Sequence, residues 1–110
     1  MKYTCSILAC SLICLGMITS PLFGADKLNV LIVDGQNNHD WRATTPVMTR
    51  ILNGCGRFVV EISTSPGGAI GDEWHPKFAD YDVVVGNYNG GDWPESVRTS
   101  LTRKTRSRSG

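Results

Sequence analysis

The sequence predicts an α/β fold in which helices flank a parallel sheet, the flavodoxin-like arrangement. Three short apolar runs, Leu28 to Val33, Phe58 to Ser63 and Asp82 to Val85, are separated by segments long enough for crossover connections. Strands that alternate with helices are typical of βαβ units with a parallel sheet. The first and third runs are almost continuously apolar, as expected of strands covered on both faces. In a flavodoxin-like order the first strand lies between the other two.

The segments between the strands carry helix signals of unequal strength. Thr44 or Thr45 can cap a helix whose first position is Pro46, and Gly54 is a natural stop. Four apolar residues then fall at helical spacing and predict one buried face: Val47, Met48, Ile51 and Leu52. A second helix should open at Trp93-Pro94, with Val97 and Leu101 on one face. Lys77 to Tyr81 is predicted to form only a single helical turn.

The first 25 residues have the features of a secretory signal peptide. Lys2 supplies a positive start, and Ile7 to Ile18 is apolar and uncharged but too short to span a membrane. With cleavage near Ala25 we expect a periplasmic or secreted protein that keeps no stable membrane span. Cys55 would then be the only cysteine left, which excludes an intrachain disulfide.

Charge is divided unevenly along the rest of the chain. Residues 26–97 carry a formal charge of −5, whereas residues 98–110 carry +5. The basic end lacks aromatic residues on which bases could stack, so we expect no nucleic-acid partner. Residues 102–110 contain no apolar side chain and are interpreted as a basic disordered tail.

Two polar loops follow the first and third predicted strands. Asp34 to Trp41 reads DGQNNHDW, and Gly86 to Trp93 reads GNYNGGDW. Both would lie at the carboxyl edge of the sheet, where ligands bind in open α/β folds. Amides offer donors and acceptors and tryptophans offer flat faces, a combination that favours a neutral sugar. The alternative is that Asn and Asp occur here because they form turns.

His39 is the residue of these loops best suited to proton transfer near neutral pH. Asp34, at the end of the strand, or Asp40 could orient its ring. We expect no metal, because no pair of His or Cys has ligand spacing, and no cofactor, because no phosphate-binding glycine motif is present. His75, between Trp74 and Pro76, is interpreted as a surface loop residue.

The chain from Lys27 to Leu101 resembles the ThuA-like (trehalose utilisation) family of the class I glutamine amidotransferase-like superfamily. The similarity lies in LNVLIVDGQNNHDW, in Thr44-Thr45-Pro46, in YDVVVGNYNG and in Trp93-Pro94. It implies a flavodoxin-like fold and a role in trehalose or keto-sugar utilisation, without amidotransferase chemistry. Family members continue with a further apolar strand where this chain reads TRKTRSRSG, so we expect a domain that is truncated after about three strands.

These observations lead to one main hypothesis and two alternatives. The main hypothesis is the amino-terminal part of an exported ThuA-like protein that acts on a small-molecule carbohydrate. The alternatives are a carbohydrate-binding module without catalysis and a non-functional truncated product. The candidate catalytic residues are His39 and Asp34. The candidate substrate-binding residues share polar or aromatic side chains on the two loops: Gln36, Asn37, Asp40, Trp41, Asn87, Tyr88 and Trp93.

Overall fold

A computed structural model of the chain describes residues 26–107. Strand β1 (Leu28–Asp34) lies at the centre of a three-stranded parallel sheet, with β2 (Phe58–Thr64) on one side and β3 (Val83–Gly86) on the other. Leu28 lies opposite Phe58, and Val30 lies opposite Val83. The α/β fold and the strand order β2-β1-β3 predicted from the sequence are therefore confirmed.

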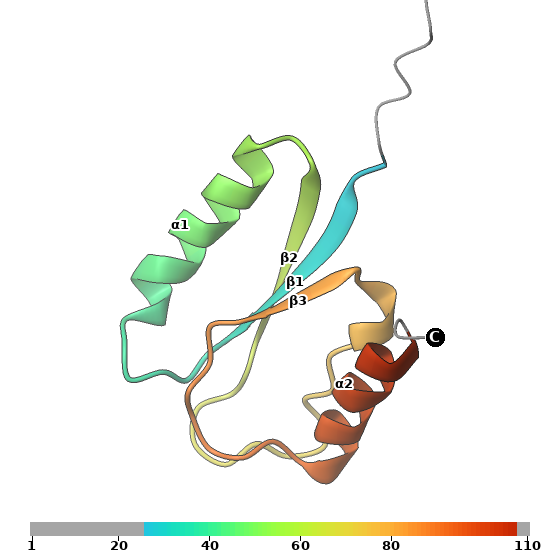
Figure 1. The fold of residues 1–110 in the computed structure, drawn as a ribbon. Helices are drawn as coiled ribbons and strands as arrows, with labels where there is room; N and C mark the ends of the chain where they lie inside the picture. The colour runs from blue at the N-terminus through green and yellow to red at the C-terminus, as the bar shows by residue number, and fades with distance from the viewer. Residues whose placement is uncertain (1–25, 108–110) are drawn as a thin grey trace, which may run out of the picture.

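The helices lie on opposite faces of this sheet (Figure 1). Helix α1 (Trp41–Gly54) packs on β1 and β2, while α2 (Glu95–Ser107) packs against the short 3-10 helix η1 (Phe78–Asp80) on the other face. Side chains alternate between the two faces of a strand. The alternation along β1 explains why all of Val30 to Val33 is buried, since both faces are covered.

The packed core lies between the sheet and α2. Leu31 and Val33 of β1 contact Phe78 of η1 and Val97 of α2, and each of these side chains is at most 2% exposed. Trp93 stacks on Phe78 with ring centroids 6.1 Å apart, and Trp74 meets Trp93 edge-on at 5.5 Å. Burial of an aromatic side chain of this size typically contributes about 1.5–3 kcal/mol, so this cluster anchors η1 and α2 to the sheet.

Helix α1 begins one turn earlier than its sequence signals suggested. Asp40 is the N-cap, with its Oδ1 accepting from the Ala43 N–H at 3.2 Å, and Pro46 lies inside the helix. A carboxylate at this position satisfies a free N–H of the first turn, which makes Asp40 a better cap than a threonine that is needed elsewhere. The predicted end at Gly54 is correct, because the helix stops there and Gly56 adopts a positive φ of 73°.

The predicted apolar face of α1 is only half right. Met48 and Leu52 are half-buried against the sheet, whereas Val47 and Ile51 are 46% and 66% exposed. The most buried residue of the helix is the polar Thr45, at 3% exposure. Its hydroxyl donates to a carboxylate of β1, and this contact rotates Val47 and Ile51 away from the sheet.

Helix α2 extends beyond the predicted boundary. It continues through Ser107, so the expectation of a disordered tail is wrong for residues 102–107. Arg, Lys and Thr can all continue a helix. Cations near the carboxyl end of a helix also interact favourably with its dipole. Lys104 also donates to the Tyr81 carbonyl oxygen, which fixes the end of the helix to the body of the protein.

Other predictions made from the sequence concern the ends of the chain. The predicted signal peptide, residues 1–25, and the last three residues lie outside the described residues. Within the described part, no helix has both the length and the apolar character that crossing a membrane requires.

A phenol–carboxylate contact between Tyr81, the residue that follows η1, and Glu61 of β2 leads to a pH prediction. The Tyr81 hydroxyl donates to Glu61 Oε2 at 2.5 Å, and this hydrogen bond, with burial, raises the pKa of Tyr81 from 10.0 to about 12. A raised folded-state pKa gives stability that is complete below pH 10 and is lost as pH rises through 12. The difference in unfolding free energy between wild type and Tyr81→Phe should therefore shrink from pH 10 to 12 in urea titrations. A difference that stays constant over this interval would contradict the contact.

Candidate functional site

The loops that follow the three strands meet at the carboxyl edge of the sheet, and Gln36 joins them. Its Nε2 donates to the carbonyl oxygens of Pro66 and Gly68 at 2.7 and 2.8 Å, after β2. Its Oε1 accepts from the Gly91 N–H at 3.3 Å, and its own carbonyl accepts from the Asn89 N–H at 2.9 Å, both after β3. Because Gln36 bonds protein backbone on both sides, it organises the edge rather than offering its amide to a ligand.

The two polar loops identified in the sequence are therefore neighbours. Gly90 of the second loop lies close to the first. A Cβ added to Gly90 would lie 2.4 Å from Gln36 Cβ and 2.7 Å from the Tyr88 hydroxyl oxygen. The Gln36 and Tyr88 side chains thus lie on one surface, which we call the rim: the loops that follow β1 and β3 at the carboxyl edge of the sheet. Such loops are expected to meet where the strand order of a parallel sheet reverses.

Asp34 lies beneath this rim and is 1% exposed. Its Oδ2 accepts from the Thr45 hydroxyl of α1 and its Oδ1 from the Thr64 hydroxyl of β2, each at 2.7 Å. Within residues 26–107 it pairs with no cation. A buried carboxylate needs such donors, because burial without them is costly. Asp34 thus holds three elements together and makes no contact with the His39 ring.

Asn37 and Asn87 form an amide pair on the rim. Asn87 Nδ2 donates to the hydroxyl oxygens of Thr44 and Thr45, each at 3.0 Å. Asn87 Oδ1 accepts from Asn37 Nδ2 at 3.1 Å, and Asn37 Oδ1 accepts from the His39 N–H at 3.2 Å. Asn37 and Asn87 are both half-buried. The structure therefore links the end of β3, the start of α1 and the loop that carries His39.

His39 is exposed at the top of this network. Its backbone is fixed by the Asn37 contact and by a turn to the Trp41 N–H, whereas among residues 26–107 no hydrogen bond reaches its imidazole. Asn38 beside it is also exposed. Their side chains are free to meet a ligand.

The remaining candidates have structural contacts of their own. Asp40 caps α1, and the half-buried Trp41 lies under the Arg42 guanidinium, whose carbon is 4.3 Å from the ring centroid. The Tyr88 hydroxyl donates to the Gly91 carbonyl oxygen at 2.6 Å, and the Tyr88 and Trp93 ring centroids are 5.3 Å apart. Burial raises the pKa of the Tyr88 hydroxyl. Trp93 belongs largely to the aromatic core.

The sequence did not single out the hydroxyl residues that support the rim. In the sequence Thr45 is only a candidate helix cap, and Thr64 lies one residue beyond the predicted end of the second strand at Ser63. Ser65 is 3% exposed and its Oγ has no hydrogen-bond partner within the described residues. A run of hydroxyl residues directly after an apolar strand, opposite another strand that ends in Asp, is the signal that could have indicated these contacts.

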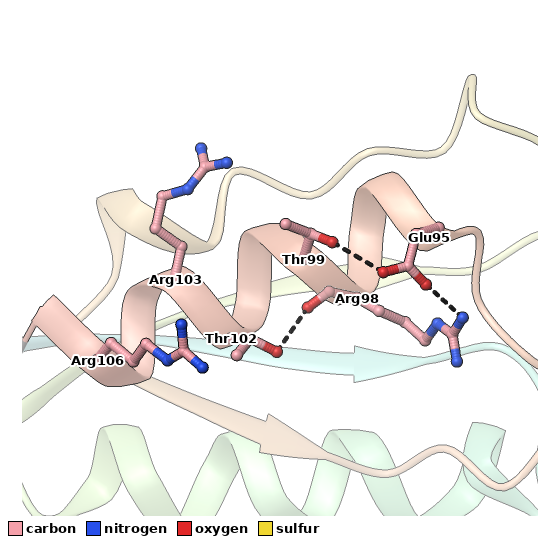
Figure 2. Close-up of a pocket in the computed structure, with 6 residues that line it drawn as sticks. All are labelled: Glu95, Arg98, Thr99, Thr102, Arg103 and Arg106. Atoms are coloured by element: carbon pink, nitrogen blue, oxygen red, sulfur yellow. Dashed lines mark hydrogen bonds and ion pairs between the residues drawn. The ribbon is translucent and has the colours of Figure 1, made fainter.

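One surface hollow lies at the second polar loop, and another lies on the basic helix α2. A hollow of about 280 Å³ is lined by residues 88–93 together with Arg98, beside the rim. A larger one, of about 480 Å³, lies on α2 (Figure 2) and is lined by residues of that helix alone. Arg98 there pairs with Glu95, while Arg103 and Arg106 extend from the helix (Figure 2). Within residues 26–107 no group of three or more His, Cys, Asp or Glu is placed to hold a metal ion.

Comparison with known proteins identifies one relative. No protein-family model matches the chain, and no curated protein does. A solved structure, of a ThuA-like protein from Parabacteroides merdae ATCC 43184, superposes with a TM-score of 0.71 at 32% sequence identity over 74% of this chain. The chain is therefore similar to a ThuA-like protein in both sequence and fold. The alignment covers 30% of the Parabacteroides protein, so the chain spans less than a third of that relative's length.

The resemblance seen in the sequence is thus confirmed, and with it the flavodoxin-like α/β fold.

Gly35 provides a test of how tightly the rim is packed. Its φ is 116°, and a Cβ there would lie 2.3 Å from the Ser65 carbonyl oxygen. Gly35→Ala should therefore lower the free energy of unfolding by at least about 2 kcal/mol, measured by urea denaturation. Gly54→Ala is the matched control, because no atom lies within 4 Å of its added Cβ, and it should not destabilise the protein. Equal stability of the two variants would show that Gly35 and Ser65 are not in contact.

Proposed function

We propose that the ThuA-like chain takes part in carbohydrate utilisation and binds a small sugar at the rim over the carboxyl edge of its sheet. The observation that supports this most strongly is the Asn37–Asn87 amide pair with the exposed Asn38 and His39 beside it. Amides both donate and accept, which suits hydroxyl groups. We further propose trehalose or a keto-sugar as the ligand, as the family resemblance implies, and an exported protein, as the first 25 residues suggest.

In this proposal His39 is the acid or base. Its backbone is held on the rim while its ring remains exposed, so the imidazole can exchange protons with a bound sugar. Asp34 is 1% exposed, and both of its oxygens accept from threonines beneath the rim rather than from the His39 ring. Its proposed role is to support the rim.

A second candidate function is sugar binding without catalysis. It is favoured by the lack of any hydrogen bond from a described side chain to the His39 imidazole, because a general base usually has an orienting partner. In that case the same residues would bind the sugar and no product would form.

The two functions are separated by substituting His39. His39→Ala should reduce conversion of a keto-sugar, followed by mass spectrometry, by about a hundredfold or more, because general acid–base catalysis contributes about that much. Its melting temperature should remain close to that of wild type, since the ring makes no hydrogen bond within the described residues. The matched control is His75→Ala, which removes the other exposed histidine.

Full turnover by His39→Ala would contradict a catalytic His39. Saturable binding of trehalose by wild type, with no product from any sugar tested, would establish the binding module instead. The absence of both binding and turnover would exclude the sugar proposal.

A further inference from the structure

Residues beneath the rim determine which atoms of the Asn37–Asn87 amide pair donate and which accept. Asp34, as a carboxylate, can only accept hydrogen bonds, so the Thr45 hydroxyl must direct its proton toward Asp34 Oδ2. The Thr44 hydroxyl likewise donates to the Asp40 carbonyl, at 3.2 Å. Both hydroxyl oxygens are therefore left as acceptors on the side that faces Asn87.

Two acceptors side by side permit only one orientation of the Asn87 amide. Its Nδ2 has two protons, and each finds one of these hydroxyl oxygens at 3.0 Å. The flipped amide would place its oxygen against two lone pairs and lose both hydrogen bonds. Asn87 Oδ1 is thereby directed outward, to Asn37.

The same reasoning fixes the next amide. Asn87 Oδ1 needs a donor and receives it from Asn37 Nδ2 at 3.1 Å, so Asn37 Oδ1 turns to the His39 N–H at 3.2 Å. One proton of Asn37 Nδ2 remains unused by the described residues, next to the second lone pair of Asn87 Oδ1. The rim thus presents a donor beside an acceptor.

We propose that Thr44, Thr45 and Asp34 act as positioning residues, which lock Asn87 and Asn37 so that the rim selects uncharged, hydroxyl-bearing ligands over phosphate. A hydroxyl can accept from Asn37 Nδ2 and donate to Asn87 Oδ1 at once without bringing a charge, whereas phosphate carries negative charge that the amide oxygens repel. The inference about the ligand rests on the proposed function; the locking of the amides does not.

The locking is tested on the ligand-free full chain by NMR of amide groups. Asn87→Asp keeps the shape but places a second oxygen before two acceptor hydroxyls. In Asn87→Asp the NMR signals of the Asn37 side-chain amide and the His39 backbone amide should shift much further than in the control variant. The control is Asn53→Asp, the same isosteric change with the same added charge at an exposed site on α1. Unchanged Asn37 and His39 signals in Asn87→Asp would overturn the locking.

A second set of variants compares the Thr45 and Thr64 hydroxyls, which lie at equal distances from the Asp34 carboxylate. Thr45→Val removes an acceptor from one Asn87 Nδ2 proton and should shift that proton's signal, and Thr45→Ser should restore it. Thr64→Val also removes a 2.7 Å bond to Asp34 but does not touch Asn87, so the Asn87 signals should remain. Equal shifts in Thr45→Val and Thr64→Val would contradict the relay and indicate a general loosening.

Ligand selection is tested separately with trehalose and inorganic phosphate as probes. Wild type should bind trehalose with shifts at the Asn37 and Asn87 side-chain amides and should bind phosphate at least about tenfold more weakly, because the amide oxygens repel its negative charge. Asn87→Asp should lose about tenfold in trehalose affinity while Asn53→Asp keeps it. Phosphate binding at these amides would overturn the selection, whereas locked amides without any sugar binding would contradict the proposed function alone.

Discussion

The buried carboxylate of Asp34 is the constraint on which the rest of the rim depends. It stands at the end of the central strand and is bonded at 2.7 Å by one hydroxyl from α1 and one from β2. Unpaired burial of such a group would be strongly unfavourable, so the two threonines must approach it when the chain folds. Their approach sets the rotation of α1, which explains why a polar threonine is the most buried residue of that helix.

A rim that is bonded from below is suited to recognition. Gln36 is occupied by backbone partners on two loops, and the Asn37 and Asn87 amides hold each other. Side chains locked in this way lose little freedom when a ligand binds, which favours affinity. Nothing in this arrangement requires the hollow on α2, whose lining comes from one helix. The sugar hypothesis therefore concerns the rim alone.

Much of the fold follows from the sequence, because its signals are local. Apolar runs such as Val30 to Val33 allow few alternatives to a covered strand, and the turn at Gly54 to Gly56 is marked by residues that tolerate its geometry. The convergence of the two polar loops also follows, since strand ends of a parallel sheet share one edge. The end of α2 does not, because Thr, Arg and Lys fit a helix and a tail equally well and a long-range contact to Tyr81 decides.

The roles within the site were less accessible for the same reason. Sequence reasoning chose Asp34 and Gln36 by chemical type, but whether their side chains face a ligand or the protein depends on residues 11 to 55 positions away in the sequence. A threonine pair that satisfies a buried carboxylate has no periodic pattern in the sequence. His39, which remains exposed, is the candidate whose loop position alone was informative.

Substitution of Asp34 by its isosteric amide tests the central claim most directly. Asp34→Asn keeps the volume but replaces one acceptor oxygen with a donor facing a hydroxyl proton. We predict that urea denaturation will show a loss of about 2 kcal/mol in unfolding free energy, as for hydrogen bonds to a charged group. The exposed Asp80→Asn, measured alongside, should change it by no more than about 0.5 kcal/mol. An Asp34→Asn protein as stable as wild type would show that the carboxylate does not hold the site together.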